Sequence, residues 1–251
     1  MKAIVLAAGR GERMRPLTDH TPKPLLPVHG KPLIEWHIEA LARAGVREIV
    51  VNTAWLEERM VEGLGDGTRF GVSLVYSMEG RGYGGALETA GGIATALPLL
   101  AGGPSDGAGR DVFWVVSGDI HAPGFHFPTD AVRRFTASDA LAHLWLVRNP
   151  PFHPRGDFGI DAQGRGIADA PGPDGRTWTY ANLALFRASF FEGVAAGTRV
   201  ALGPMLFNAM RARRVTCEVW RGAWENVGTP AQLAALNRTP APVSQRPGDT
   251  P

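Results

Sequence analysis

The chain has 251 residues, of which 44% are hydrophobic, and its 26 basic and 24 acidic side chains leave a net charge of +2. This length fits one large α/β domain, and no run of like charge marks a nucleic-acid-binding surface. The single cysteine, Cys217, excludes an intramolecular disulfide and fits a reducing compartment. No apolar run approaches the ~18 residues that span a membrane. Because Met1-Lys2 leads directly into the first predicted strand, we expect a cytoplasmic protein without a signal peptide. The oligomeric state stays open.

The first part of the chain alternates between short apolar runs and segments with apolar residues at helical spacing. Strands are predicted at 3–7, 48–52 and 72–77, and helices at 33–44 and 55–64. Strand, helix, strand, helix, strand is the pattern of a doubly wound, mostly parallel (Rossmann-like) α/β sheet flanked by helices.

The middle of the chain is rich in glycine. Residues 79–92 predict a loop built for close approach to a ligand rather than a packed element, with a small-residue helix over 87–97. Residues 101–110 predict a mobile surface loop. The most apolar run, 112–117, predicts a central strand that ends at Gly118-Asp119. Ligands of open parallel sheets bind beyond the carboxyl ends of the strands, so Asp119 is a candidate functional residue.

The last part of the chain predicts further strands and helices and then a tail. Strands are predicted at 142–148, 157–160, 166–168, 182–187 and 215–220, and helices at 130–137, 201–213 and 230–237. Residues 238–251 contain several prolines and no apolar periodicity, which predicts a disordered tail. We therefore expect one domain over 1–237 and a tail over 238–251.

The stretch from Gly9 to Pro24 combines a glycine-rich turn with cations. Gly9 and Gly11 follow the first strand, where backbone amides can approach a ligand without a side chain in between. Arg13 and Lys23 follow, and such a turn is a typical place to bind phosphates. Lys23 is one of only three lysines and stands between two prolines that restrict its backbone.

Two other phosphate-binding motifs fit this stretch less well. A P-loop needs the spacing Gly-x-x-x-x-Gly-Lys-Ser/Thr, which does not occur. A dinucleotide-binding turn needs a third glycine, but Met14 occupies that position and Pro16 would cut the following helix short.

The stretch from Gly9 to Pro24 resembles the signature of the sugar-1-phosphate nucleotidyltransferases, Gly-x-Gly-x-Arg-Met/Leu-x-Pro-Leu-Thr followed by Pro-Lys-Pro, at every fixed position. Gly118-Asp119 and the Trp-x-x-Val-Gly-Thr that begins at Trp224 resemble other parts of the family, so the resemblance extends to about Asn237. The chain is most similar to the small single-domain members that act on N-acetylmuramic acid 1-phosphate. A C-terminal β-helix, which larger relatives carry, is not expected.

The resemblance implies a Mg²⁺-dependent enzyme that couples a nucleoside triphosphate to a sugar 1-phosphate and releases pyrophosphate, with UTP and N-acetylmuramic acid 1-phosphate as the favoured pair. It implies catalytic roles for Arg13 and Lys23. The implied nucleotide-binding residues are Leu6, Ala7, Ala8, Gly9, Gly11, Glu12, Arg13, Lys23 and Glu79. The implied sugar-binding residues are Glu88, Thr89, Asp157 and Asn182. Asp119 and Asn226 are the implied metal ligands, and Arg155 is a candidate partner for the lactyl carboxylate of the sugar.

The chain departs from the family pattern at three places. The glycine run over 80–85 is longer than the family's loop and lacks its proline. Ser117 stands where similar members often have asparagine before Gly-Asp, and Asn226 stands where relatives carry a second metal aspartate. Two alternative functions therefore stay open. One is the same reaction on mannose 1-phosphate with GTP, or on glucose 1-phosphate with UTP or dTTP. The other is a sugar-nucleotide sensor without turnover.

Overall fold

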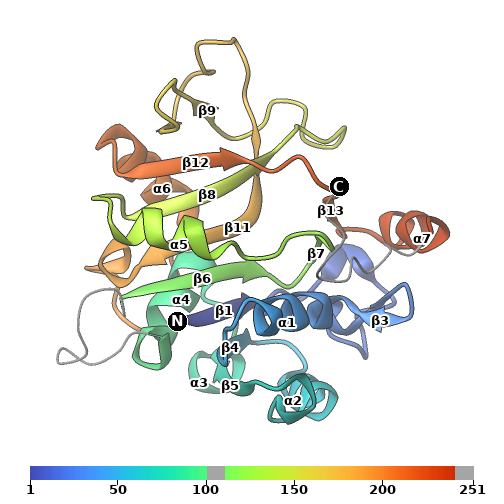
Figure 1. Ribbon diagram of the computed structural model, residues 1–251. Coiled ribbons are helices and arrows are strands. Elements are labelled where there is room, and N and C mark those ends of the chain that lie inside the picture. Colours follow the sequence, from blue (N-terminus) through green and yellow to red (C-terminus); the bar gives the residue numbers. More distant parts are fainter. Residues whose placement is uncertain (101–110, 241–251) are drawn as a thin grey trace.

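The computed structural model describes residues 1–100 and 111–240 of the chain. Its centre is a seven-stranded sheet in the order β12-β8-β11-β6-β1-β4-β5 (Figure 1). The strands of this sheet are β1 (Lys2–Leu6), β4 (Glu48–Thr53), β5 (Ser73–Met78), β6 (Val112–Ser117), β8 (Ala142–Val147), β11 (Thr179–Arg187) and β12 (Val215–Val219). All neighbouring strands pair in parallel except at β11, which is antiparallel to both β6 and β8. The predicted doubly wound, mostly parallel α/β fold is therefore confirmed.

Helices cover both faces of this sheet (Figure 1). They are α1 (Leu33–Arg43), α2 (Glu57–Leu64), α3 (Glu79–Tyr83), α4 (Glu88–Leu100), α5 (Thr129–Thr136), α6 (Leu202–Arg211) and α7 (Pro230–Arg238). Short two-stranded pairs complete the fold: β2 (Pro27–Val28) with β3 (Lys31–Pro32), β9 (Gly159–Ile160) with β10 (Gly166–Ile167), and β7 (Ile120–His121) with β13 (Glu225–Asn226). None of the helices in the described residues is long and apolar enough to cross a membrane.

Alternating side chains of the central strands form two cores. In β6, Trp114 and Val116 pack with α1, α2 and α5, whereas Phe113 and Val115 pack with α4 and α6 on the opposite face. This alternation explains why the central strands read as continuous apolar runs, because both of their faces are buried. β6 has the same bounds as predicted and occupies the middle of the sheet.

A third, smaller core joins the two ends of the described chain. Met14 and Val28 from the N-terminal region pack with Val227 and Leu233 from the C-terminal region. The Asn237 side chain adds two hydrogen bonds, from its Nδ2 to Pro27 O (3.1 Å) and from His29 N to its Oδ1 (2.6 Å). The segment that contains β13 is thereby held beside the glycine-rich turn that follows β1.

The structure corrects one prediction about the glycine-rich middle of the chain. Residues 79–92 were predicted as a loop up to a helix over 87–97, but Glu79–Tyr83 form the short helix α3. The predicted helix is present as α4, from Glu88 to Leu100. The Glu57 carboxylate of α2 accepts hydrogen bonds from Gly80 N (2.9 Å) and Arg81 N (3.0 Å), which satisfies the free amides at the start of α3.

Two other predictions concern the C-terminal part of the chain and the segment 101–110. The last helix runs to Arg238, one residue beyond the predicted domain boundary. The predicted mobile loop over 101–110 lies outside the described residues, as does the predicted disordered tail from residue 241 onward.

Candidate active site

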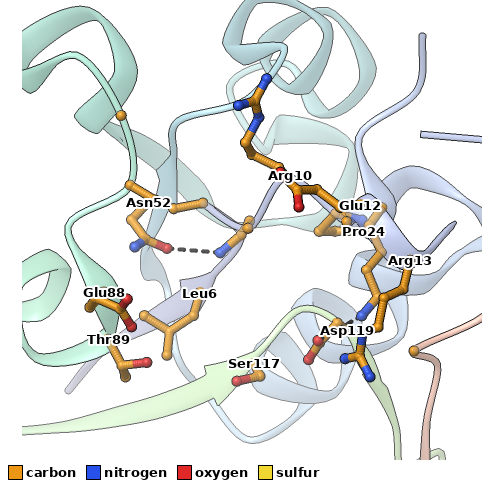
Figure 2. Close-up of a pocket in the computed structure, with 18 of the residues that line it drawn as sticks. Leu6, Arg10, Glu12, Arg13, Pro24, Asn52, Glu88, Thr89, Ser117 and Asp119 are labelled. Carbon is orange, nitrogen blue, oxygen red and sulfur yellow. Dashed lines mark hydrogen bonds and ion pairs between the residues drawn. The ribbon is translucent and has the colours of Figure 1, made fainter. Parts of the chain in front are cut away.

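A cavity of ≈ 880 Å³ lies beyond the carboxyl ends of β1 and β6. Figure 2 shows Leu6 and Ser117 from these strand ends between two groups of polar side chains, Glu88 and Thr89 on one side and Arg13 and Asp119 on the other. The lining residues are Leu6, Ala7, Ala8, Gly9, Arg10, Gly11, Glu12, Arg13, Lys23, Pro24, Asn52, Gly84, Gly85, Ala86, Glu88, Thr89, Ser117, Asp119, Arg199 and Gly228. The sheet edge predicted to carry the ligand therefore does hold the cavity.

The turn after β1 forms one wall of this cavity. Gly11 has a φ of +64°, in the left-handed region that favours glycine, and a Cβ there would lie 3.0 Å from Thr18 Cγ2. Gly9 differs, because its φ is not positive and a Cβ would meet no atom within 4 Å among the described residues. The protein's own packing does not require glycine at position 9, and the open space beside its backbone is available to a ligand.

Lys23 and Asp119 form an ion pair within the cavity. Lys23 Nζ lies 2.8 Å from Asp119 Oδ2, and the Lys23 side chain is only 10% exposed. Lys23 is the first residue of a 3₁₀ turn, Lys23–Leu25. Its neighbours Pro22 and Pro24 restrict the backbone on either side and so fix the direction of the Lys23 side chain. Gly118 holds Asp119 in place through the hydrogen bond from Gly118 N to Leu6 O (2.8 Å). The cation and the carboxylate predicted to be functional thus lie together, although they are 96 residues apart in the sequence.

Asp119 and Asn226 are neighbours through β7 and β13. Asn226 pairs with Ile120, and Val227 N donates to Asp119 O at 3.0 Å. Asn226 Oδ1 is buried and has no hydrogen-bond partner among the described residues. Of the two predicted metal ligands, Asp119 lines the cavity and Asn226 does not. A carboxylate and an amide oxygen are both oxygen donors of the kind that Mg²⁺ prefers. Within the described residues, no three His, Cys, Asp or Glu side chains cluster as a metal site.

Glu79, which was predicted to bind the nucleotide, lies behind the cavity wall. It is fully buried and does not line the cavity. Its Oε1 accepts from Asn52 Nδ2 (2.6 Å) and its Oε2 from Leu87 N (2.8 Å), while Asn52 Oδ1 accepts from Ala7 N (2.8 Å). Burial raises the pKa of the Glu79 carboxyl. Glu79 therefore connects the turn after β1 with the start of α4 through Asn52 and Leu87.

Gly92 of α4 makes this connection sterically feasible. A Cβ at Gly92 would lie 2.5 Å from Glu79 Oε1 and 2.8 Å from Asn52 Nδ2. Any larger residue would push the Glu79 carboxylate and the Asn52 amide apart. Glycine at position 92 therefore preserves the hydrogen bond that positions Asn52 in the cavity wall.

Of the four predicted sugar-binding residues, two line the cavity and two do not. Glu88 and Thr89 line it at the start of α4, and Glu88 has a φ of +62°, which is uncommon for a residue with a side chain and often accompanies function. Asp157 lies outside, because its oxygens pair with Tyr180 N (2.8 Å) and His153 Nε2 (2.9 Å). Asn182 also lies outside, at the irregularity in the β11–β8 pairing, with a φ of +58°.

The cavity contains residues that the sequence interpretation did not single out. Arg199 lines it, and its Nε lies 3.8 Å from Glu88 Oε1. Arg10, for which the sequence predicted no specific role, stacks over the Trp55 ring at 4.5 Å. Asn52 could have been suspected from its place at the end of a predicted strand, but Arg199 carries no local signal because a loop from a distant part of the chain brings it to the site.

The nucleotidyl transferase family model matches residues 2–167, and the chain therefore belongs to the nucleotidyl transferase family. This class agrees with the fold and with the cavity built from the signature turn.

Individual relatives give a finer comparison. The chain is 45% identical to an N-acetylmuramate alpha-1-phosphate uridylyltransferase from Neisseria meningitidis, over 93% of this chain and 95% of that protein. It is 30% identical to a glucose-1-phosphate thymidylyltransferase from Streptomyces griseus, over 95% of this chain and 65% of that protein. A solved structure from Bacillus anthracis, described as a putative glucose-1-phosphate thymidylyltransferase, matches with a TM-score of 0.75 at 22% identity and covers 94% of both chains. At that identity, the last comparison supports the fold alone.

Proposed function

We propose that this protein transfers a uridylyl group from UTP to N-acetylmuramic acid 1-phosphate, giving the UDP-sugar and pyrophosphate. The observation that carries the reaction class is the placement of Lys23, Arg13 and Asp119 in one cavity at the carboxyl edge of the sheet. The substrate pair rests on the 45% identity to the Neisseria uridylyltransferase over nearly the full length of both proteins.

The reaction joins two anions, so the protein must offset their repulsion. A sugar-phosphate oxygen attacks the α-phosphorus of UTP, one P–O bond forms, and the bond to the leaving pyrophosphate breaks. Lys23 Nζ is the buried cation available to the α-phosphate and the incoming phosphate, while Arg13 offsets the charge of the pyrophosphate. Positioning and electrostatics are sufficient for such a transfer, and no covalent enzyme intermediate is required.

Mg²⁺ is part of this proposal. Asp119 and Asn226 would hold the ion, which would supply positive charge to offset the charge of the phosphates. Asp119 Oδ2 is already paired with Lys23 Nζ within the protein.

The remaining lining residues divide into two groups. The backbone from Leu6 to Gly9, together with Gly11 and Glu12, lies where the nucleotide would bind, and Gly84, Gly85 and Ala86 offer further backbone groups for the base. Glu88 and Thr89 would contact the sugar. Because N-acetylmuramic acid is a peptidoglycan sugar and UTP is a cytoplasmic metabolite, we place the reaction in peptidoglycan recycling in the cytoplasm.

One alternative has an observation in its favour. The 30% identity to a glucose-1-phosphate thymidylyltransferase spans 95% of this chain, so glucose 1-phosphate with dTTP or UTP is the second candidate pair. A sensor without turnover draws its support from the amide at position 226, where the family pattern has a carboxylate.

Pyrophosphate release across a panel of substrates distinguishes these functions. The panel pairs UTP, dTTP and GTP with the 1-phosphates of N-acetylmuramic acid, glucose and mannose, with and without Mg²⁺. We expect the fastest release with UTP and N-acetylmuramic acid 1-phosphate. Faster release with glucose or mannose 1-phosphate would overturn the sugar and spare the reaction class, whereas no release with any pair would favour the sensor.

A further inference from the structure

A second large cavity, the aromatic cleft, opens on the same sheet edge as the nucleotide cavity. It has a volume of ≈ 860 Å³ and shares no lining residue with the first cavity. Its walls come from the ends of β8 and β12, from Trp178 just before β11, and from β13 and α7. Because β8 and β12 run parallel to β6 in this sheet, their carboxyl ends share its edge. β8 lies two strands from β6, about 10 Å at the usual strand spacing.

Aromatic side chains line this cleft. Trp178 is buried, Trp220 and Trp224 are half-buried, and Phe152 is 52% exposed. Trp224 is held by the hydrogen bond from its Nε1 to Ala181 O (2.9 Å). The Trp220 ring packs so closely on Gly222 that no Cβ would fit there. Fixed aromatic rings in a concave site offer flat apolar surfaces on which the C–H faces of a sugar ring can pack.

Two arginines line the same cleft from adjacent parallel strands. β12 pairs with β8 up to Val219 and Leu146, and Arg221 and Arg148 each lie two residues beyond these partners. Both are exposed, and within residues 1–100 and 111–240 neither forms an ion pair or a side-chain hydrogen bond. Like charges on neighbouring strands repel. An anionic group between them would remove that repulsion and could accept hydrogen bonds from both guanidinium groups.

The segment around β13 contributes lining residues to both cavities. Glu225 lines the aromatic cleft, and Gly228, three residues later, lines the nucleotide cavity. Gln232 lines the cleft as well, and its Oε1 accepts from Gly228 N at 2.9 Å. A ligand whose phosphate lies beside Lys23 and Asp119 could therefore extend past β13 into the cleft.

We propose that the aromatic cleft receives the carboxylate-bearing substituent of the sugar 1-phosphate and that Arg148 and Arg221 determine specificity for it. This inference rests on the proposed function. The ligand class is a hexose 1-phosphate with a carboxylate on the ring edge remote from the phosphate, which the lactyl group of N-acetylmuramic acid provides. Glu225 and the Gln232 amide supply further polar groups for ring hydroxyls.

This assignment replaces Arg155, the partner for the carboxylate that the sequence suggested. Arg155 is exposed, and it lines neither the nucleotide cavity nor the aromatic cleft. Arg155→Gln is therefore the matched control for Arg148→Gln and Arg221→Gln, because it removes a nearby exposed guanidinium that does not line the cleft.

The test compares steady-state kinetics of wild type and variants with N-acetylmuramic acid 1-phosphate as the varied substrate. Loss of either cleft arginine should lower kcat/KM for this sugar about 10- to 100-fold, the scale of one charge-assisted hydrogen bond, without changing KM for UTP. Arg155→Gln should match wild type, and Arg221→Lys should recover part of the loss. Unchanged kcat/KM in both cleft variants, or an equal rise in KM for UTP, would overturn the proposal.

A binding measurement separates failure of this proposal from failure of the proposed function. If wild type shows no turnover with the acidic sugar phosphate, the proposed function fails, and tryptophan fluorescence is titrated with N-acetylmuramic acid and with N-acetylglucosamine, which lacks the carboxylate. Saturable quenching by the acidic sugar that weakens about 10-fold or more in Arg148→Gln and Arg221→Gln supports the cleft assignment. Quenching that is absent, or independent of both arginines, overturns it.

Discussion

Replacing Lys23 by alanine should lower turnover about 10²–10³-fold, equivalent to ~2.7–4 kcal/mol of transition-state stabilisation, because it removes one preorganised electrostatic donor. The structure supports the upper part of this range. The Lys23 side chain is 10% exposed and its Nζ is held 2.8 Å from Asp119, so water cannot readily replace the ammonium group. The folded state should lose only about 1 kcal/mol, because the Asp119 side chain is 36% exposed and remains solvated.

The assay is pyrophosphate release at saturating UTP and N-acetylmuramic acid 1-phosphate, with melting temperature measured alongside. Lys31→Ala is the matched control, because Lys31 pairs with Glu39 and lies over the Trp36 ring outside the cavity. We expect the control to retain turnover within about a factor of two of wild type. Lys23→Arg should recover little, since a planar guanidinium does not replace a compact ammonium group. Turnover of Lys23→Ala within a factor of two of wild type would refute the catalytic assignment.

Three further predictions follow from the site and its supports. Asn226→Asp should tighten Mg²⁺ binding without nucleotide, because it adds a negative charge beside Asp119; calorimetry that finds tight binding already in nucleotide-free wild type would contradict this. Glu79→Gln should cost about 1–3 kcal/mol in urea unfolding, because an amide cannot accept from both Asn52 Nδ2 and Leu87 N; unchanged stability would contradict the connecting role. Burial lowers the pKa of His37 to about 4, so the folded state resists its protonation, and stability should fall as the pH drops from about 6.5 to 4. The loss from this group is of the order of 3 kcal/mol, and an equally steep pH dependence in His37→Gln would refute the assignment.

The sequence predicts the sheet well because its strands carry strong local signals. β6 is apolar along its whole length, since both of its faces are buried, and its predicted bounds agree with the structure. The turn after β1 is equally readable, because its glycines, Arg13 and Lys23 are nearly contiguous. The short helix α3 has no such local signal, because its first amides donate to the carboxylate of Glu57, which is more than 20 residues away in the sequence.

Two predicted site residues lie outside the cavity for the same reason. Glu79 follows a predicted strand and looks like a ligand-binding acid, but the side chain of Asn52 and the amide of Leu87 meet it in the interior. The Asp157 carboxylate accepts a hydrogen bond from Tyr180 N on β11, outside the cavity. The aromatic cleft escapes sequence interpretation altogether, because its walls come from three separate stretches of the chain that only the sheet order brings together.

The most direct test of the central claim is to identify the product. Wild-type protein is incubated with UTP, N-acetylmuramic acid 1-phosphate and Mg²⁺, and the reaction is followed by ³¹P nuclear magnetic resonance. We predict that the sugar monophosphate signal disappears while a sugar-linked diphosphate and pyrophosphate appear in equal amounts, and that Lys23→Ala slows both together. Hydrolysis of UTP without a sugar-linked product, or product formation that Lys23→Ala leaves unchanged, would contradict nucleotidyl transfer in this cavity.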